Sequence, residues 1–352
     1  MIIYFILVTC PIFANFTQQI NVGKSKYVRG VTVLRDNIYV LCRPSAKVIN
    51  VCLTRNSSQP QMEMEIPGVK SPVDVESSEK ETCLYVSDFL QKCIWKITRN
   101  TDGRPNIIQW LTLDYHPSTL SVSSDDQLLM VNATLSILNI YGSDTQLILS
   151  IRLSEDFRNP RHAVETSTGN FIISHQWMEH KKEVNVLSGW KLECKSSISE
   201  ATRDGQMLMR RFIPSNETEQ LNYPPYLFID SNDRVLVTED DRVILLNSDL
   251  KWNRINWRSK EENIEAMTLQ RVCYDEDARQ LIVAGFSHLA VYVYTLSKHS
   301  LEPACLLELF ILTSICMLWP TISSLGLSSE LCSETRDLNF VVPPMGQEPN
   351  QI

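Results

Sequence analysis

Histidine, arginine and aromatic residues stand at the ends of short apolar segments, where their side chains could bind a metal or a partner. His162 and His175 could ligate a metal from neighbouring loops, but no third ligand stands at a diagnostic spacing. The ten cysteines include no C-x-x-C pair, and the chain has no H-E-x-x-H, G-x-S-x-G, G-x-G-x-x-G, Walker or EF-hand motif. We therefore expect no catalytic residues, no metal and no cofactor.

Charge also restricts the partners of the chain. Its 352 residues carry 33 Lys plus Arg against 41 Asp plus Glu, a net charge of −8. The average field of such a protein repels nucleic acids and anionic lipids, so an RNA-binding role would need a local basic patch.

The elements that position these side chains recur along the sequence as a strand, a polar turn, a second apolar strand and usually a third strand. The two clearest copies lie at 71–97 and 226–246, where apolar residues alternate or form compact runs. The centres of the second strands recur about every 45 residues, at Val40, Val86, Met130, Ile173, Val237 and Val283. The interval after Ile173 is longer, and we expect its polar residues 181–222 to form an extended outer hairpin or loop.

A repeat of this length with several strands per unit is typical of β-propeller blades, and the apolar spacing does not fit helical repeats. We predict an all-β fold: a six-bladed β-propeller over residues 15–296, closed by an N-terminal strand, with a non-propeller C-terminal tail. The closing strand should be 16–22, paired beside 290–294, because an unclosed ring would leave sheet edges unpaired.

The two ends of the chain lie outside the predicted propeller. Residues 1–14 form an apolar segment of signal-peptide length that lacks a positively charged start. Residues 297–327 include the apolar run 305–319, a possible membrane anchor or a frayed helix, and 328–352 form a polar tail that we expect to be disordered. We expect a cytoplasmic protein, with secretion or membrane anchoring as the alternatives.

The repeat resembles the NHL family, whose blades run from Pro through alternating apolar residues and a turn into a strand ending in Asp. Pro72, Val75, Val86 and Asp88 fall in register in one copy, as do Pro225, Ile229, Val237 and Asp240 in another. The resemblance is to NHL regions of tripartite-motif ubiquitin ligases and of stand-alone invertebrate proteins. It implies an adaptor role in ubiquitin-linked regulation. No RING or B-box pattern precedes the repeats, so ligase activity is not implied.

In a four-stranded blade, the start of the first strand and the loop after the second strand lie on the same face of the disc. We expect ten residues there to form a partner-binding surface, because exposed aromatic and Arg side chains dominate binding hot spots: Arg29, Arg43, Phe89, Arg161, His162, His175, Trp177, Tyr226, Arg271 and Phe286.

These observations favour a non-enzymatic binding scaffold that uses one propeller face to hold a protein or peptide, and they favour a monomer. An RNA-binding propeller is the alternative, although the acidic net charge disfavours it. A metal-dependent propeller hydrolase or lyase is a further alternative, which would require a central-channel cluster that no linear motif shows.

Overall fold

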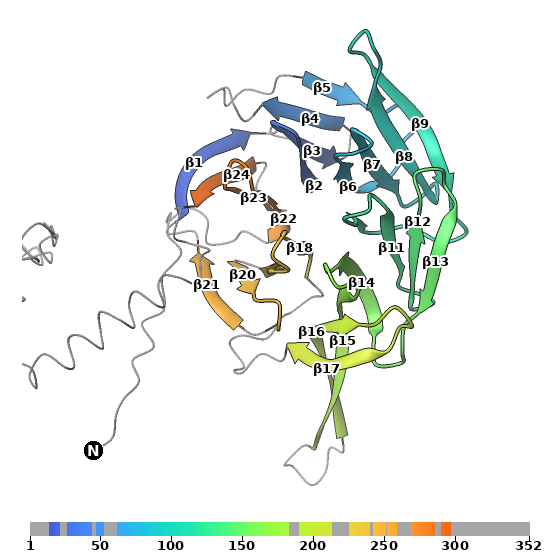
Figure 1. The fold of residues 1–352 in the computed structure, drawn as a ribbon, viewed down its shortest axis with the longest axis vertical. Coiled ribbons are helices and arrows are strands. Elements are labelled where there is room, and N and C mark those ends of the chain that lie inside the picture. The colour runs from blue at the N-terminus through green and yellow to red at the C-terminus, as the bar shows by residue number, and fades with distance from the viewer. Residues whose placement is uncertain are drawn as a thin grey trace, which may run out of the picture. The chain divides into compact units, whose positions relative to one another are not determined.

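Six four-stranded antiparallel sheets surround a common axis in the computed structural model of the chain (Figure 1). The structure describes residues 14–21, 27–43, 47–52, 62–182, 190–212, 225–239, 242–250, 252–258, 269–285 and 290–296, and every structural statement below concerns these residues. The chain divides into two units, 1–300 and 301–352, and all of the sheets belong to the first unit. The prediction of an all-β propeller is confirmed.

Each blade is a meander, numbered here in chain order. Blade 1 contains β2 (Tyr27–Leu34), β3 (Asn37–Arg43), β4 (Lys47–Cys52) and β5 (Met62–Glu65). Blade 2 contains β6 (Pro72–Ser78), β7 (Cys83–Asp88), β8 (Cys93–Arg99) and β9 (Pro105–Thr112). Blade 3 contains β10 (Leu120–Val122), β11 (Leu128–Asn132), β12 (Ile137–Tyr141) and β13 (Leu147–Arg152).

The other three blades follow the same order. Blade 4 contains β14 (Arg158–Glu165), β15 (Phe171–Lys182), β16 (Trp190–Ala201) and β17 (Met207–Phe212). Blade 5 contains β18 (Leu227–Ile229), β19 (Val235–Glu239), β20 (Arg242–Leu246) and β21 (Trp252–Arg258). Blade 6 contains β22 (Leu269–Asp275), β23 (Gln280–Gly285), β24 (Ala290–Leu296) and β1 (Ala14–Asn21).

The predicted closure by an N-terminal strand is confirmed. Strand β1 pairs antiparallel with β24, from Ala14 opposite Leu296 to Asn21 opposite Ala290. The hydroxyls of Thr17 and Thr295 lie 2.8 Å apart across this junction. The closing strand begins two residues earlier than expected, at Ala14 rather than Phe16. Blade 6 therefore combines both ends of the repeat region, which leaves no open edge on β24.

The apolar core lies between neighbouring blades rather than in one central cluster. One cluster joins blades 1 and 2 and includes Leu41, Val75 and Val86, whereas another joins blades 3 and 4 and includes Ile140 and Phe171. Second strands can therefore be buried on both faces, as in β7 and β11, where every residue is buried. This explains why these segments read as continuous apolar runs in the sequence.

A repeated polar contact also joins the blades, at the turns between first and second strands. The Arg35 backbone N–H donates to Glu79 over 2.8 Å, between blades 1 and 2. The Ser167 N–H donates to Asp233 over 2.7 Å, between blades 4 and 5, and the Ser231 N–H donates to Glu276 over 2.6 Å, between blades 5 and 6. These contacts fix the angle between adjacent sheets on the face where the innermost strands end.

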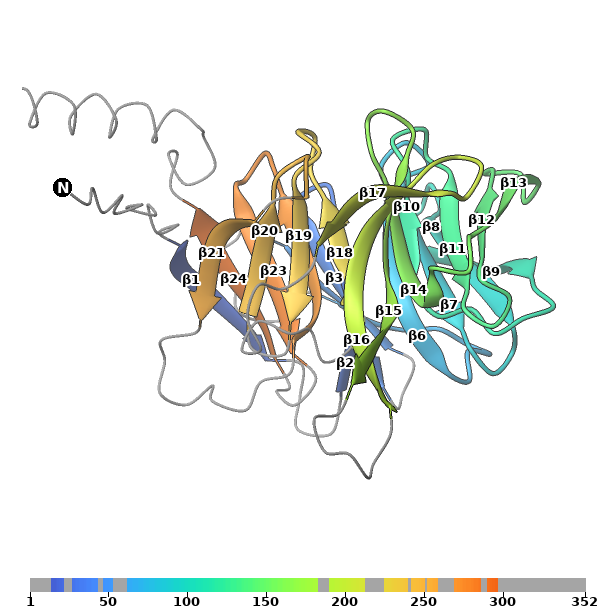
Figure 2. The ribbon, with the colours of Figure 1, turned by 90° about the horizontal axis from the view of Figure 1, so that it is seen from below.

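Two further sequence expectations concern the insertion and the chain ends. The long interval in blade 4 contains a hairpin in which β15 and β16 pair from Phe171 opposite Ala201 to Lys182 opposite Trp190, so that it projects past the other sheets (Figures 1 and 2). No helix occurs in the described part of the chain, so none there could cross a bilayer. The segments 1–13, 297–327 and 328–352, with the apolar run 305–319, lie outside the described residues.

Candidate functional site

Bulges in the innermost strands bring polar side chains to the axis at the end where these strands begin. The register shifts between Val28 and Gly30 in β2 and between Leu269 and Arg271 in β22. Similar shifts occur between Pro72 and Asp74 in β6 and across 158–162 in β14. An extra residue in a strand re-aims the side chains around it, and such bulges are frequent beside active sites. Four blades therefore turn polar residues toward the same central space.

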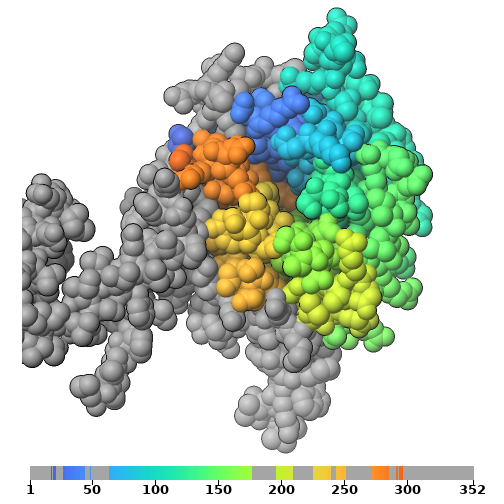
Figure 3. Space-filling model, in the orientation of Figure 1, coloured from blue at the N-terminus to red at the C-terminus, as the bar shows by residue number. Residues whose placement is uncertain are grey.

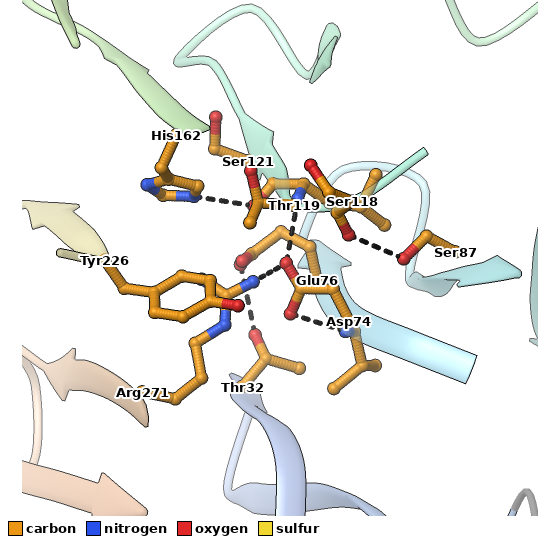
Figure 4. Close-up of polar contacts among 12 residues, drawn as sticks. Thr32, Asp74, Glu76, Ser87, Ser118, Thr119, Ser121, His162, Tyr226 and Arg271 are labelled. Atoms are coloured by element: carbon orange, nitrogen blue, oxygen red, sulfur yellow. Dashed lines mark hydrogen bonds and ion pairs between the residues drawn. The ribbon is translucent and has the colours of Figure 1, made fainter. Parts of the chain in front are cut away.

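A buried ion pair joins blade 2 to blade 6 in this space. The Arg271 guanidinium contacts the Asp74 carboxylate, which also accepts the Leu120 N–H over 2.8 Å and the Val75 N–H over 2.9 Å (Figure 4). Burial lowers the pKa of Arg271 to about 9, so the guanidinium keeps its charge at neutral pH. Asp74 therefore connects blades 2, 3 and 6, and its oxygens are occupied by structural contacts.

Gly30 allows this close approach of β2 to β6. A Cβ atom at Gly30 would lie 2.8 Å from the Val75 backbone nitrogen and 3.0 Å from an Asp74 carboxylate oxygen. Neither of these atoms can move without disturbing β6 or the ion pair. The position therefore requires a residue without a side chain, for reasons of space rather than of backbone angle.

Tyr226 contacts two guanidinium groups at the same end of the axis. Its ring centroid is 4.2 Å from Cζ of Arg271 and 4.7 Å from Cζ of Arg161, and Arg161 donates a hydrogen bond to the Tyr226 hydroxyl over 3.2 Å. Burial lowers the pKa of Arg29, and the charges of Arg43 and Arg161 lower it further. We call Arg29, Arg43 and Arg161 the axial arginines.

Glu76 supplies a second carboxyl group that faces the central space. It follows Asp74 by two residues on β6 and so shares its face, and it points toward the same region as Thr32, Arg271 and Tyr226 (Figure 4). The Thr32 hydroxyl donates to Glu76 over 3.2 Å, and the Ser77 N–H donates to it over 3.4 Å. Burial raises the pKa of Glu76 to about 7, against the smaller lowering effect of these two hydrogen bonds.

The two histidines are structural in this arrangement. His162 Nε2 donates to the Leu120 carbonyl over 3.0 Å, and its Nδ1 accepts the Leu227 N–H over 3.2 Å, so the ring connects blades 3, 4 and 5. Burial lowers the pKa of His162 to about 4, so the ring is neutral. Nε2 of the buried His175 lies 3.0 Å from the Ser199 hydroxyl. Among the described residues, no group of three or more His, Cys, Asp or Glu side chains could hold a metal.

The ten residues expected on an exposed face are placed differently by the structure. Phe89 is exposed, at 41%, and stacks on His116. Arg29, Arg43 and Arg161 are half-buried, whereas the remaining four described side chains are buried: His162, His175, Tyr226 and Arg271. The side chain of Trp177 and the whole of Phe286 lie outside what the structure describes.

The expectation of exposed loop tips is wrong for these four buried residues. His162 and Arg271 lie within the innermost strands β14 and β22, and Tyr226 directly precedes β18. Such positions are close to the axis, where neighbouring blades cover them. The structure nevertheless brings three of the ten residues together, because Arg161 and Arg271 both contact the Tyr226 ring.

Sequence analysis missed Asp74, Glu76 and Thr32 as site residues. The signal was present in the alternation of Asp74 and Glu76 with Val73 and Val75. Both faces of an innermost propeller strand pack against neighbouring blades, and only the axis can offer it contact with water. A charged residue at alternate positions of such a strand must therefore point toward the axis or into a contact between blades.

Several solved structures resemble this chain, among them proteins named as lyases and as a gluconolactonase. Virginiamycin B lyase from Staphylococcus aureus, a catalytically inactive variant with quinupristin, has a TM-score of 0.53 and 11% identity over 80% of this chain and 99% of its own. A streptogramin B lyase has a TM-score of 0.54 and 12% identity over 80% of this chain and 97% of its own. A protein provisionally assigned as a gluconolactonase has a TM-score of 0.50 and 10% identity, covering 82% and 93%.

These likenesses show a β-propeller, and at such identities they show the fold alone. No family model and no curated protein matches the chain. The expectations of a non-enzymatic scaffold, and of a chain that is not an enzyme, are contradicted because the lyases and the assigned gluconolactonase are enzymes on this fold. The physical reason for the error is that a propeller site is assembled from separate blades, so the absence of a linear motif does not exclude it.

Side chains from every blade close around the axis (Figure 3). The central site comprises Asp74 and Glu76 from blade 2, Arg29 and Arg43 from blade 1, Arg161 and His162 from blade 4, Tyr226 from blade 5 and Arg271 from blade 6. It combines one carboxyl group of raised pKa with a tyrosine hydroxyl among positive charges. Such a set can remove a proton at one point and stabilise negative charge at another.

Proposed function

We propose that the chain is a propeller enzyme that carries out proton transfer at the axis, with Glu76 as the general base. The observation that supports this most directly is the pKa of Glu76, raised to about 7 by burial in a central space. A general base works best when its pKa lies near the working pH. The half-buried Glu76 is held by a threonine hydroxyl and one backbone N–H.

The other ionisable groups of the site are less suited to this role. Asp74 is held by Arg271 and two backbone N–H groups, and His162 has both ring nitrogens bonded to backbone groups. Burial raises the pKa of the Cys273 thiol well above its usual value, which disfavours the nucleophilic thiolate. Glu76 can change its protonation state without breaking a contact between the neighbouring backbones.

The opposite part of the site is suited to negative charge that develops on a substrate oxygen. Tyr226 offers a hydroxyl that is polarised by the hydrogen bond from Arg161, and Arg271 keeps a positive charge next to the ring. In a buried site such groups stabilise an oxyanion more strongly than water does. Glu76 would take a proton from a carbon or from a water molecule, and the negative charge would form on an oxygen that faces Tyr226.

This arrangement supports two reaction classes: elimination next to a carbonyl, or opening of an ester or lactone by water. Solved structures that share the fold are named as lyases and, provisionally, as a gluconolactonase, and these names support the proposal. Membership of the NHL family also remains a proposal. It is supported by the residues in register in blades 2 and 5.

The test is turnover of a panel of aryl esters, γ- and δ-lactones and a cyclic depsipeptide by the full chain, with Glu76→Gln compared with the matched control Glu155→Gln. Glu155 is exposed and lies outside the site. We expect Glu76→Gln to lower kcat/KM by about 10² to 10⁴ and the control to be unchanged. The wild-type rate should rise with pH through about 7, where Glu76 loses its proton. Absence of turnover across the panel, or an equal rate for Glu76→Gln, would refute the proposal.

A further inference from the structure

A chain of hydroxyl groups connects Glu76 to blade 1. The Thr32 hydroxyl donates to Oε1 of Glu76 over 3.2 Å and lies 2.9 Å from the Ser77 hydroxyl oxygen. The Ser77 hydroxyl donates in turn to the Val33 carbonyl over 2.6 Å. Thr32 and Val33 belong to β2, whereas Glu76 and Ser77 belong to β6. The hydroxyls therefore connect the innermost strands of two blades, and Thr32 is only 2% exposed to water.

Thr32 has one hydroxyl proton for two acceptors. The Ser77 hydroxyl gives its own proton to the Val33 carbonyl, so its oxygen can accept a hydrogen bond from Thr32. Thr32 can donate either to this oxygen or to Oε1 of Glu76. Hydrogen bonds to an ionised carboxylate are stronger than hydrogen bonds between neutral groups. The direction of the Thr32 proton should therefore depend on whether Glu76 carries a proton.

The hydrogen bonds to Glu76 also distinguish its two oxygens. The Thr32 hydroxyl and the Ser77 N–H both donate to Oε1, over 3.2 and 3.4 Å. A carboxyl group held by one oxygen keeps a fixed orientation, because its other oxygen can then point in only a few directions. In the proposed reaction, Oε2 would be the oxygen that takes the proton from the substrate.

We propose that Thr32 is a positioning residue for Glu76, whose hydroxyl donates to Ser77 while Glu76 is protonated and turns to Oε1 when Glu76 loses its proton. Figure 4 shows Thr32 and Glu76 beside the same central space. The inference rests on the proposed function, because it assigns the group that positions the general base. Both forms of Glu76 then have a matching neighbour, and the proton can leave after rotation of one O–H bond without movement of the strands.

Other charged and titratable groups stand on the elements around Glu76. Among the described residues, the Thr32 hydroxyl is bonded to Glu76 and Ser77 and to none of these groups. They stay the same when Thr32 or Ser77 is replaced, so a difference between such variants reports on the hydroxyls. These groups include Arg29, Arg43, Asp74, Tyr85, Tyr226, Arg271 and Cys273.

Titration of the glutamate side-chain carboxyl groups by ¹³C NMR in the full chain tests the proposal, with the Glu76 signal identified by its loss in Glu76→Gln. Thr32→Val keeps the shape of the side chain and removes the hydroxyl. It should raise the pKa of Glu76 by about 1, because a hydrogen bond to the charged form is lost. Ser77→Ala removes the competing acceptor and should lower this pKa, because Thr32 can then donate to Glu76 alone.

The double variant Thr32→Val/Ser77→Ala should titrate as Thr32→Val does, because the Ser77 hydroxyl acts on Glu76 only through Thr32. Thr32→Ser keeps the hydroxyl and should titrate close to the wild type. The matched controls are Thr119→Val and Ser121→Ala, since these hydroxyls donate to backbone carbonyls of β14 between blades 3 and 4. Both controls should leave the pKa of Glu76 unchanged.

Three results would overturn the proposal: an unchanged pKa of Glu76 in Thr32→Val, a shift in Ser77→Ala in the same direction as in Thr32→Val, or a shift of equal size in the controls. Circular dichroism of each variant checks that the propeller is folded. If Thr32→Val does not fold, Ser77→Ala and Thr32→Ser decide the outcome, because the proposal requires a lower pKa in the first and a nearly unchanged pKa in the second.

The titration needs no turnover, so its outcome is separate from that of the proposed function. Shifts in the expected directions without turnover would refute the enzymatic proposal and leave the response of the Thr32 hydroxyl to Glu76 standing. Turnover that requires Glu76 but has the same pH dependence in Thr32→Val would refute the positioning role alone. If both proposals hold, kcat of Thr32→Val should fall about fivefold at pH 7 and approach the wild-type value as pH rises.

Discussion

The substitution Glu76→Gln should change how the stability of the propeller depends on pH. Folding raises the pKa of Glu76 from 4.5 to about 7, so the folded state binds a proton that the unfolded state has released. The free energy of unfolding therefore falls as pH rises from about 4.5 through about 7. At about 1.4 kcal/mol for each pKa unit, the loss has an upper limit of about 3 kcal/mol.

His162 contributes with the opposite sign. Its pKa falls from 6.5 in the unfolded chain to about 4 in the folded chain, so between these values the unfolded state binds the additional proton. The free energy of unfolding then rises with pH, again by up to about 3 kcal/mol. Between about pH 4.5 and 6.5 the effects of Glu76 and His162 oppose each other, and the wild-type stability should be nearly constant there as far as these two groups decide it.

Glu76→Gln removes the pH dependence of stability that comes from Glu76 and leaves the opposite dependence that comes from His162. The variant should gain about 2 to 3 kcal/mol in stability from pH 4.5 to 6.5, and at pH 8 it should be more stable than the wild type. The assay is urea unfolding at constant ionic strength from pH 4.5 to 8, with Glu155→Gln as the control. If Glu76→Gln reproduces the wild-type curve, the pKa of Glu76 is not raised and its assignment as general base is wrong.

Two other substitutions test the contacts that hold the site. Gly30→Ala would place a methyl group against the Val75 nitrogen and the Asp74 carboxylate, and we expect it to destabilise the propeller by about 1 to 3 kcal/mol in urea unfolding; an unchanged midpoint would mean that β2 and β6 can separate freely. Ser231→Ala removes the hydroxyl that donates to Glu276 over 2.5 Å between blades 5 and 6, but keeps the backbone N–H contact. A loss of about 1 kcal/mol is expected, with a larger loss when Glu276→Gln is used instead, since both contacts then lose the negative charge.

The fold was largely accessible from the sequence, because it depends on apolar periodicity. The second strands contain runs of apolar residues, centred for example on Val40, Val86, Ile173 and Val283. Such runs can be recognised in the sequence without knowing which blades contact each other. Closure by the N-terminal strand was also predictable, since a ring with an open edge is unfavourable. An outer hairpin or loop was expected over residues 181–222, whereas the long hairpin of blade 4 pairs 171–182 with 190–201 and so begins earlier in the sequence.

The site was less accessible, because its geometry depends on the bulges. The register shift between Val28 and Gly30 changes which way nearby side chains of β2 face, yet no residue pattern in β2 marks that position. The contact of His162 with Leu120 and Leu227 also joins three blades that are distant in sequence. Whether a histidine is a ligand or a structural group is decided by such contacts, and residue type alone does not reveal them.

The axis of this propeller carries two kinds of polar residue that differ in what holds them. Asp74 and His162 bond to backbone groups of neighbouring blades, so losing either would separate innermost strands. Glu76 is held by a threonine hydroxyl and one N–H of its own strand, and the axial arginines repel one another. Both of these arrangements are unfavourable for the folded state on electrostatic grounds. The contrast between Glu76 and the structural residues Asp74 and His162 therefore supports the proposed proton transfer at the axis.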